Sequence, residues 1–473
     1  MRVRRILATL YATLILTGCI HVDRPPLPET EFTYDERDFI PSDIPLPKPE
    51  VNQRPTIGAK TMLVTVTHWQ DGSLLNYELV KKHTLSPDPD SLQSYVSAAS
   101  GGKMTLTGQV IQHTSGPMPQ ICKTGSPMPI NLAAEEGHKT AKANGLDADT
   151  FDFFISVIQC GGNASAWKPG RFIGVYGQPG SPHVYKHEFG HSLGYSHGTK
   201  FTQCPKDGNT VTAPTGCSTI SYGDTGDSVS GGGTLYPANN RWYSGWLDNG
   251  QTAVIAQDGL YRLTKLGEQG AQLYLINRPG MKPSQMAMEL RGPTRFDNFP
   301  VDDNRVNGVW IRYTTMAGSV DNTQVDGTPE TNSTADPTFV GGKLLRDDET
   351  GTTVEVCSVN SSAAVLAVSK GSTLTRCTSA LVAPTIQAPA AGAAPVSSPV
   401  VFSGTSRPGA LINLSYRVAG SSNWKDIKVS ADAHGNWAAR LPELIPGKYN
   451  AQAWQTMGSS ASLATFRNFE VVP

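Results

Sequence analysis

The chain of 473 residues is longer than one hydrophobic core usually supports, so two or three domains are expected. Its 39 basic and 40 acidic residues give a net charge of −1, which excludes the basic footprint of a nucleic-acid-binding protein. Charged residues make up only 17%, while 47 glycines and 34 prolines favour strands and loops over long helices.

Residues 1–19, "MRVRRILATLYATLILTGC", combine a basic start, a short apolar run and small residues before Cys19. This pattern predicts a signal peptide, and its ending resembles that of bacterial lipoproteins, in which Cys19 becomes the lipidated N-terminus. An ordinary signal peptide or a short anchor helix is the alternative. Residues 20–57 are rich in proline and acidic residues and are expected to form a stalk or linker. We therefore expect an exported lipoprotein, attached to the membrane through Cys19, at the outer membrane or cell surface or secreted.

Between residues 58 and 250, strand patterns alternate with helical patterns. The expected strands cover 61–69, 103–112, 151–160 and 171–177, and the expected helices cover 89–102 and 130–146. The run 151–160 is almost continuously apolar, as in a buried strand, whereas 171–177 alternates as an edge strand does. This order predicts an α/β (α+β) domain with a twisted mixed sheet.

The segment 251–380 contains short strands separated by turn residues, so it is expected to form a β-sandwich domain. A Pro/Ala-rich break covers 381–399, and strands then recur at regular spacing to the end of the chain. The stretches "SGTSRPGALINLSY" and "DAHGNWAARLPELIPGKYNAQA" resemble a bacterial Ig-like domain, assigned to 381–473. The expected architecture is an α/β domain followed by two all-β sandwich domains.

Apart from Cys19, the chain has an even number of cysteines, which is typical of disulfide pairing in an exported protein. These are Cys122, Cys160, Cys204, Cys217, Cys357 and Cys377. Proximity in the sequence favours pairing the third with the fourth and the fifth with the sixth, which leaves the first two for each other. An oxidising compartment is therefore expected.

Four of the ten histidines fall between residues 183 and 197, within "HVYKHEFGHSLGYSH". On a helix His187 and His191 share a face, so both can bind one metal ion. Glu188 is rotated about 100° from the first ligand, which places its carboxylate beside the ion. Gly194 permits the chain to turn and bring His197 in from another direction. Three imidazoles with an open fourth position are typical of a catalytic zinc site.

The pattern HExxHxxGxxH resembles that of the metzincin zinc metalloproteases, and its context resembles the gametolysin-like peptidases. Shared elements are "YVSAASGGKMTLTGQVI", "HEFGHSLGYSH", "SYGDTGDSVSGGG" and "NNRWYSGWL", and the resemblance covers roughly 60–375. It implies a metzincin-like catalytic domain at 58–250 in which His187, His191 and His197 hold Zn²⁺. Glu188 would be the general acid/base on a zinc-bound water. The implied activity is hydrolysis of peptide bonds in extracellular proteins or glycoproteins.

The sequence departs from the family in one position, because Val229 stands where a methionine is expected beneath the zinc. Tyr222, in "YGD", falls near residues that lie close to the zinc in such families, and it receives no role here. His183 is expected to be a loop residue and not a fourth ligand. Asp224 and Asp227 are expected to cap turns, with calcium binding as the alternative.

Two other functions compete with a protease. A surface adhesin or binding lipoprotein with a degenerate zincin domain would account for Val229 and the Ig-like domain. A zinc-dependent amidase acting on non-protein amides would use the same motif. The complete set of three histidines and Glu188 argues against the adhesin.

Overall fold

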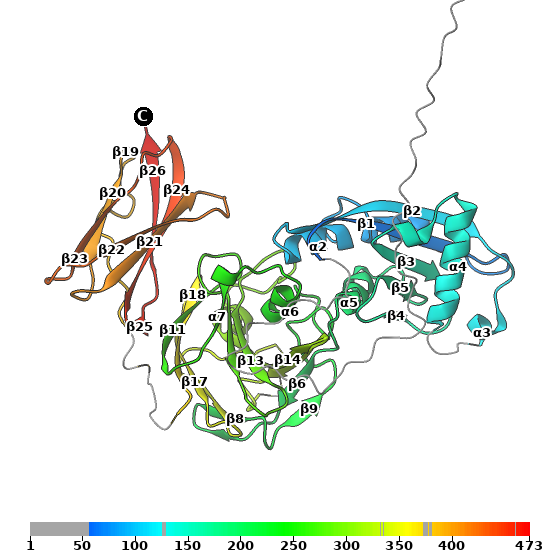
Figure 1. Ribbon diagram of the computed structural model, residues 1–473, viewed down its shortest axis with the longest axis horizontal. Helices are drawn as coiled ribbons and strands as arrows, with labels where there is room; N and C mark the ends of the chain where they lie inside the picture. Colours follow the sequence, from blue (N-terminus) through cyan, green and yellow to red (C-terminus); the bar gives the residue numbers. More distant parts are fainter. Residues whose placement is uncertain are drawn as a thin grey trace, which may run out of the picture.

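The computed structural model describes residues 56–124, 129–331, 333, 335–371, 377, 381–458 and 460–473. The predicted signal peptide, Cys19 and nearly all of the predicted stalk lie outside these residues. In the described part of the chain, no helix is both long and apolar enough to cross a membrane. The fold is a sheet-rich mixture of α and β structure in several units, arranged as in Figure 1.

The first sheet has the strand order β2-β1-β3-β5-β4. Its strands are β1 (Gly58–His68), β2 (Met104–Thr114), β3 (Phe153–Ile158), β4 (Ala164–Ala166) and β5 (Phe172–Val175). All neighbours pair in parallel except β4 and β5, so the sheet is mixed, as predicted. The predicted edge strand at 171–177 is wrong: β5 is buried and paired on both sides, and β4 forms the edge. A strand as short as β4 has no alternation that a sequence pattern can reveal.

Helices cover both faces of this sheet (Figure 1). They are α1 (Tyr77–His83), α2 (Leu92–Ala99), α3 (Gln120–Lys123), α4 (Ile130–Ala143), η1 (Ala148–Thr150) and α5 (Pro182–Ser192). Helix α4 packs on one face against Phe154, where Gly137 permits close approach because a Cβ there would lie 2.5 Å from the Phe154 ring. Helices α2 and α5 pack on the other face, where their buried side chains share one apolar cluster with the sheet.

The middle unit contains two sheets that enclose one apolar core. The seven-stranded sheet comprises β10 (Thr252–Val254), β12 (Leu273–Asn277), β13 (Gln285–Leu290), β14 (Val309–Ala317), β15 (Ser319–Val325), β6 (Thr199–Thr202) and β9 (Ser218–Ile220). The six-stranded sheet comprises β11 (Gly259–Thr264), β18 (Ala363–Ser369), β17 (Thr353–Val359), β16 (Leu344–Asp347), β8 (Thr210–Ala213) and β7 (Lys206–Asp207). The short helices are α6 (Ala238–Tyr243), α7 (Asn304–Asn307) and η2 (Asn249–Gln251).

The middle unit recruits strands from both sides of the boundary predicted at residue 250. Strand β6 pairs in parallel with β15, and β8 pairs in parallel with β16. The boundary therefore does not coincide with a boundary between sheets. A sequence pattern identifies neighbouring strands but not parallel partners more than one hundred residues away.

The last unit has its own core around Trp437. Its strands are β19 (Val396–Ser397), β20 (Val401–Thr405), β21 (Leu411–Val418), β22 (Lys425–Ser430), β23 (Asn436–Arg440), β24 (Gly447–Met457), β25 (Ser460–Ala461) and β26 (Thr465–Val472). One sheet has the order β19-β26-β24-β21-β22 with β25 beside β24, and β20 pairs with β23. All these strands come from one continuous stretch of the chain.

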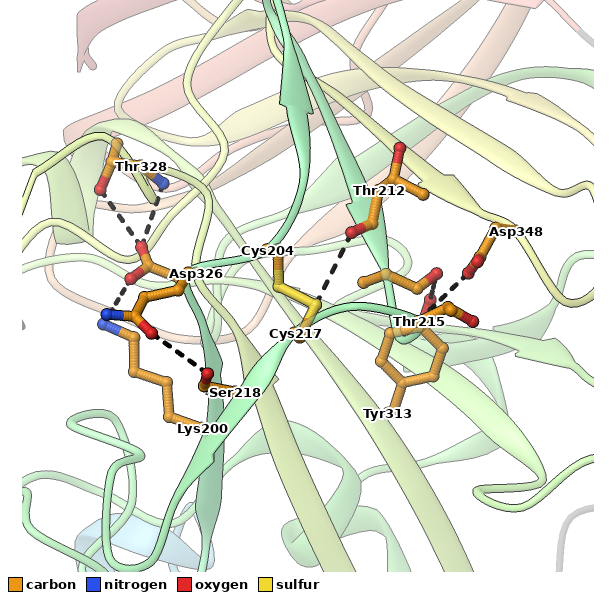
Figure 2. The surroundings of a disulfide bond; sticks show 12 residues. Lys200, Cys204, Thr212, Thr215, Cys217, Ser218, Tyr313, Asp326, Thr328 and Asp348 are labelled. Carbon is orange, nitrogen blue, oxygen red and sulfur yellow. Dashed lines mark hydrogen bonds and ion pairs between the residues drawn. A yellow bond between two sulfur atoms is a disulfide. The ribbon is translucent and has the colours of Figure 1, made fainter.

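The three disulfides pair as expected from proximity. They join Cys122 to Cys160, Cys204 to Cys217 and Cys357 to Cys377. The disulfide Cys204–Cys217 joins the segment that follows β6 to the residue that precedes β9, close to the ion pair of Lys200 with Asp326 (Figure 2). Disulfides are typical of proteins that fold in an oxidising compartment.

Candidate metal centre

Helix α5 carries the histidine motif, and local signals fix both of its ends. Pro182 occupies its first turn, where the missing N–H costs no hydrogen bond. The helix ends at Ser192, and Gly194 has a φ of +98°, a left-handed conformation that a side chain would disfavour. This turn reverses the chain toward His197, as the sequence predicted.

The fold brings His187, His191 and His197 together, with one ring nitrogen of each within 4.8 Å of the others. The Nε2 atoms of His191 and His197 are 3.0 Å apart. Tetrahedral ligands at Zn–N distances of about 2.1 Å lie about 3.4 Å from one another, so the spacing is close to that of a metal site. The three histidines could therefore hold a metal ion.

Hydrogen bonds set which ring nitrogens face the centre. His187 Nδ1 lies 3.0 Å from the Ser228 carbonyl oxygen, and His191 Nδ1 lies 2.6 Å from the Tyr195 carbonyl oxygen. Because a carbonyl oxygen only accepts, both Nδ1 atoms must donate, which leaves each Nε2 with a lone pair for a metal. This tautomer leaves Nε2 of both rings able to bind a metal ion.

Burial keeps these rings neutral. Burial, together with the nearby His197 and His183, lowers the pKa of His187 to about 4. Burial lowers the pKa of His191 well below its usual range. Both imidazoles are therefore uncharged at neutral pH, which favours a cation at the centre over protons.

A cleft of about 530 Å³ opens in front of the three histidines. It is lined by Asn163, Ala164, Ser165, Ala166, Gln178, Ser181, His183, Val184, His187, Glu188, His191, His197, Tyr222 and Ser230. The buried side chain of Glu188 thus borders the same space as the candidate ligands. Glu188 and the candidate metal ligands therefore line one cleft.

Tyr222, which the family resemblance places near the metal without a role, lines the same cleft. Its hydroxyl oxygen lies 3.0 Å from His197 Nε2, and its ring centroid lies 4.2 Å from that of His197. Its φ of +56° is costly for a residue with a Cβ. Partial burial and the nearby Glu188 raise the pKa of Tyr222, so the phenol is protonated and can donate.

Val229 lies directly against α5, between the turns that carry the first two histidines. It is fully buried, and a Cβ added to Gly190 would lie 2.2 Å from its Cγ2. An apolar side chain therefore supports the helix here in place of methionine. His183 lies in the first turn of α5, so the expectation of a loop residue is wrong. It lines the cleft but stands outside the ligand group, 5.8 Å from His187 between ring centroids.

The two aspartates after Tyr222 are buried and do not form an exposed calcium loop. The carboxylate of Asp224 accepts hydrogen bonds of 2.6 and 3.1 Å from Arg312 on β14. Asp227 accepts from the Val229 backbone N–H at 2.9 Å, and burial beside Asp224 raises its pKa to about 7. Both residues anchor the loop, which agrees with the expected structural role.

Sequence patterns missed the two carbonyls that orient the rings, from Ser228 and Tyr195, because any residue type supplies a carbonyl. They also missed the wall formed by β4. The short stretch "NASA", residues 163–166, has no pattern that predicts a strand.

Comparisons with known proteins do not assign the chain to a family. Neither the family models nor the curated proteins give a match. A superoxide reductase (neelaredoxin) from Ignicoccus hospitalis is 15% identical over 20% of this chain and 84% of its own, with a TM-score of 0.16. A fungal alcohol oxidase in complex with copper is 15% identical over 40% of each chain, with a TM-score of 0.15. A structure described as a protease is 10% identical over 87% of this chain and 97% of its own, with a TM-score of 0.16. Likenesses with scores this low carry no argument about fold or function.

Proposed function

We propose that this protein is an exported, lipid-anchored zinc metalloendopeptidase of the metzincin type, similar to the gametolysin-like peptidases. The observation that carries the proposal is the convergence of His187, His191 and His197 in a cleft that Glu188 also lines. The proposed substrates are extracellular proteins or glycoproteins. The three disulfides support an oxidising location for the proposed protease.

The donor set fits zinc. Three neutral imidazoles, two of them held through Nδ1 by backbone carbonyls, match the borderline-soft ligands that zinc prefers. When bound, zinc would supply a Lewis acid that polarises a carbonyl and acidifies water. The cleft leaves one side of the histidines open to a substrate.

We assign Glu188 the role of general acid/base, because its buried side chain lines the same cleft as the three histidines. Its carboxylate would accept the proton of the attacking water and then deliver it to the leaving amine of the cleaved peptide bond. Tyr222 would donate a hydrogen bond from its hydroxyl to the carbonyl oxygen, where negative charge develops. The contact of this hydroxyl with His197 Nε2, at 3.0 Å, supports the assigned role.

The test compares wild type with Glu188→Gln, a substitution that keeps the shape of the side chain and removes the base. We expect proteolysis to fall by about 10²–10⁴-fold while zinc binding is retained. Glu135→Gln is the matched control, because Glu135 is an exposed glutamate on α4 that forms an ion pair with Lys139 outside the cleft lining. Cleavage sites in a mixed glycoprotein digest, mapped by mass spectrometry with and without a chelator, provide the readout.

Equal activity of wild type and Glu188→Gln would overturn the proposal, as would a wild-type protein that binds no zinc. Zinc-dependent cleavage of non-peptide amides without peptide cleavage would favour the amidase. Glycan or surface binding by an inactive wild type would favour the adhesin.

A further inference from the structure

The segment that carries His197 is attached to the middle β unit on both sides of the histidine. The Val320 N–H donates to the Gly194 carbonyl at 2.9 Å, and the Ser196 N–H donates to the Val320 carbonyl at 2.8 Å. Beyond His197, β6 pairs with β15. The buried ion pair of Lys200 with Asp326, at 2.9 Å, fixes the same strand. The third candidate ligand is therefore held on β15.

The loop that orients His187 is attached to the neighbouring strand β14. Ser228, whose carbonyl accepts from His187, lies four residues after Asp224. Arg312 donates to both carboxylate oxygens of Asp224 and contacts the Gly226 carbonyl at 3.4 Å. Arg312 also forms an ion pair with Glu289, which accepts from the Ala238 N–H at 2.8 Å where the loop ends.

The side chains of this network are buried. Arg312, Asp224 and Glu289 are each at most 2% exposed. Removing one partner of a buried charge pair leaves the other charge uncompensated, so the remaining groups must rearrange or admit water.

We propose that Arg312 is a positioning residue of the metal centre, and that the β14–β15 hairpin is a structural part of that centre. Arg312 holds the loop so that the Ser228 carbonyl faces His187 Nδ1, while β15 holds His197. This inference rests on the proposed zinc site and adds the middle β unit to it. Groups that orient metal ligands typically contribute 10–100-fold to metal affinity.

The experiment compares Arg312→Met with Arg278→Met in the full chain. Arg278 is the matched control because it is another fully buried arginine of the middle unit, with an ion pair to the fully buried Asp347. Three quantities are measured: zinc affinity by chelator competition, the visible spectrum of the cobalt-substituted protein, and the Tm of the metal-free protein. The first two report on ligand geometry, and the third reports on packing.

We expect Arg312→Met to weaken zinc binding by about 10-fold or more and to change the cobalt spectrum. Both Met variants should lower the Tm of the metal-free protein by a similar amount, but Arg278→Met should leave the zinc affinity and the cobalt spectrum unchanged. The zinc affinity of Arg312→Lys should lie between those of wild type and Arg312→Met. Equal effects of the two Met variants on zinc affinity would overturn the inference. If Arg312→Met does not fold, Asp224→Asn replaces it, with the same expected loss and the same overturning result. A wild type without zinc affinity refutes the proposed function itself, which distinguishes the two failures.

Discussion

The middle β unit and the C-terminal sandwich have the same appearance in the sequence, yet they have different relations to the metal centre. The C-terminal unit takes all its strands from 396–472 and has a core of its own. The middle unit takes strands from 199–220 as well as 252–369, and each of its two sheets contains strands from both segments. Strand β6 begins two residues after His197, so the middle unit is joined directly to the segment that carries the third histidine.

The apolar cores make the same distinction. Val320 and Met316 of the middle unit belong to the core cluster that also contains Phe189 and Val229, which lie on and against α5. The C-terminal unit has no residue in that cluster and meets the middle unit elsewhere, as where the Arg262 guanidinium lies 4.4 Å above the Trp454 ring and Leu463 packs on a small apolar cluster. None of the residues in this contact lines the cleft.

Truncation gives the largest expected effect. A protein ending at residue 250 leaves β6 and β8 without β15 and β16 and exposes the shared core, so we expect loss of cooperative unfolding and of zinc binding. A protein ending at residue 383 should keep both. Circular dichroism during heating and zinc titration measure the two outcomes, and a folded, zinc-binding 58–250 fragment would break the comparison.

Metal removal is expected to separate the two β units in a calorimeter. Zinc present at a thousandfold excess over its Kd stabilises the folded state by about 4 kcal/mol. Chelation should therefore lower the Tm of the unit containing α5 and β15, and leave the transition of the C-terminal sandwich in place. A parallel shift of all transitions would show that the units unfold as one.

The Cys204–Cys217 disulfide offers a somewhat smaller effect, confined to the middle unit. The two cysteines are 13 residues apart, and closing a loop of about this size contributes about 3 kcal/mol. The double substitution Cys204→Ser and Cys217→Ser should reduce the free energy of unfolding by that amount, measured by urea denaturation. The C-terminal sandwich contains no cysteine and serves as the internal control.

The raised pKa of Asp227 predicts that the free energy of unfolding depends on pH. Its folded pKa is raised from 3.8 to about 7, so its stability contribution is present below pH 3.8 and is lost as the pH rises to 7. Asp227→Asn keeps an acceptor for the Val229 N–H and avoids a buried charge. We expect it to stabilise the protein by about 1–3 kcal/mol at pH 8 and less at pH 5, measured by urea denaturation.

Asp224→Asn is the contrasting variant, because it removes the charged partner of Arg312. It should destabilise the protein at both pH values. A stabilising effect of Asp224→Asn at pH 8 would contradict the assignment of separate roles to the two aspartates.

The sequence predicted the parts of the site that depend on local geometry. The i, i+4 spacing placed His187 and His191 on one face of α5, and Gly194 supplied the turn to His197. Its strand patterns also identified most of the first sheet, since buried strands there are long and apolar. The three disulfides followed from proximity.

Long-range partners could not be predicted in the same way. Nothing in the pattern of 309–325 indicates that Arg312 reaches Asp224 or that Val320 binds the chain beside His197. Tyr222 reaches the centre through a left-handed backbone conformation that its residue type disfavours. These features depend on the path of the whole chain and become visible only in three dimensions.

The contact of Val229 with Gly190 also links the substitutions that these two positions can accept. Any side chain at position 190 meets Val229 Cγ2 at 2.2 Å, so Gly190→Ala requires movement of the loop or of the helix that carries two histidines. Reducing Val229 to alanine removes this closest contact and leaves Tyr236 Cε1 at 3.0 Å from the added Cβ. We therefore expect the effects of substitutions at positions 190 and 229 to be coupled, with Gly190→Ala costing less stability after Val229→Ala than before it.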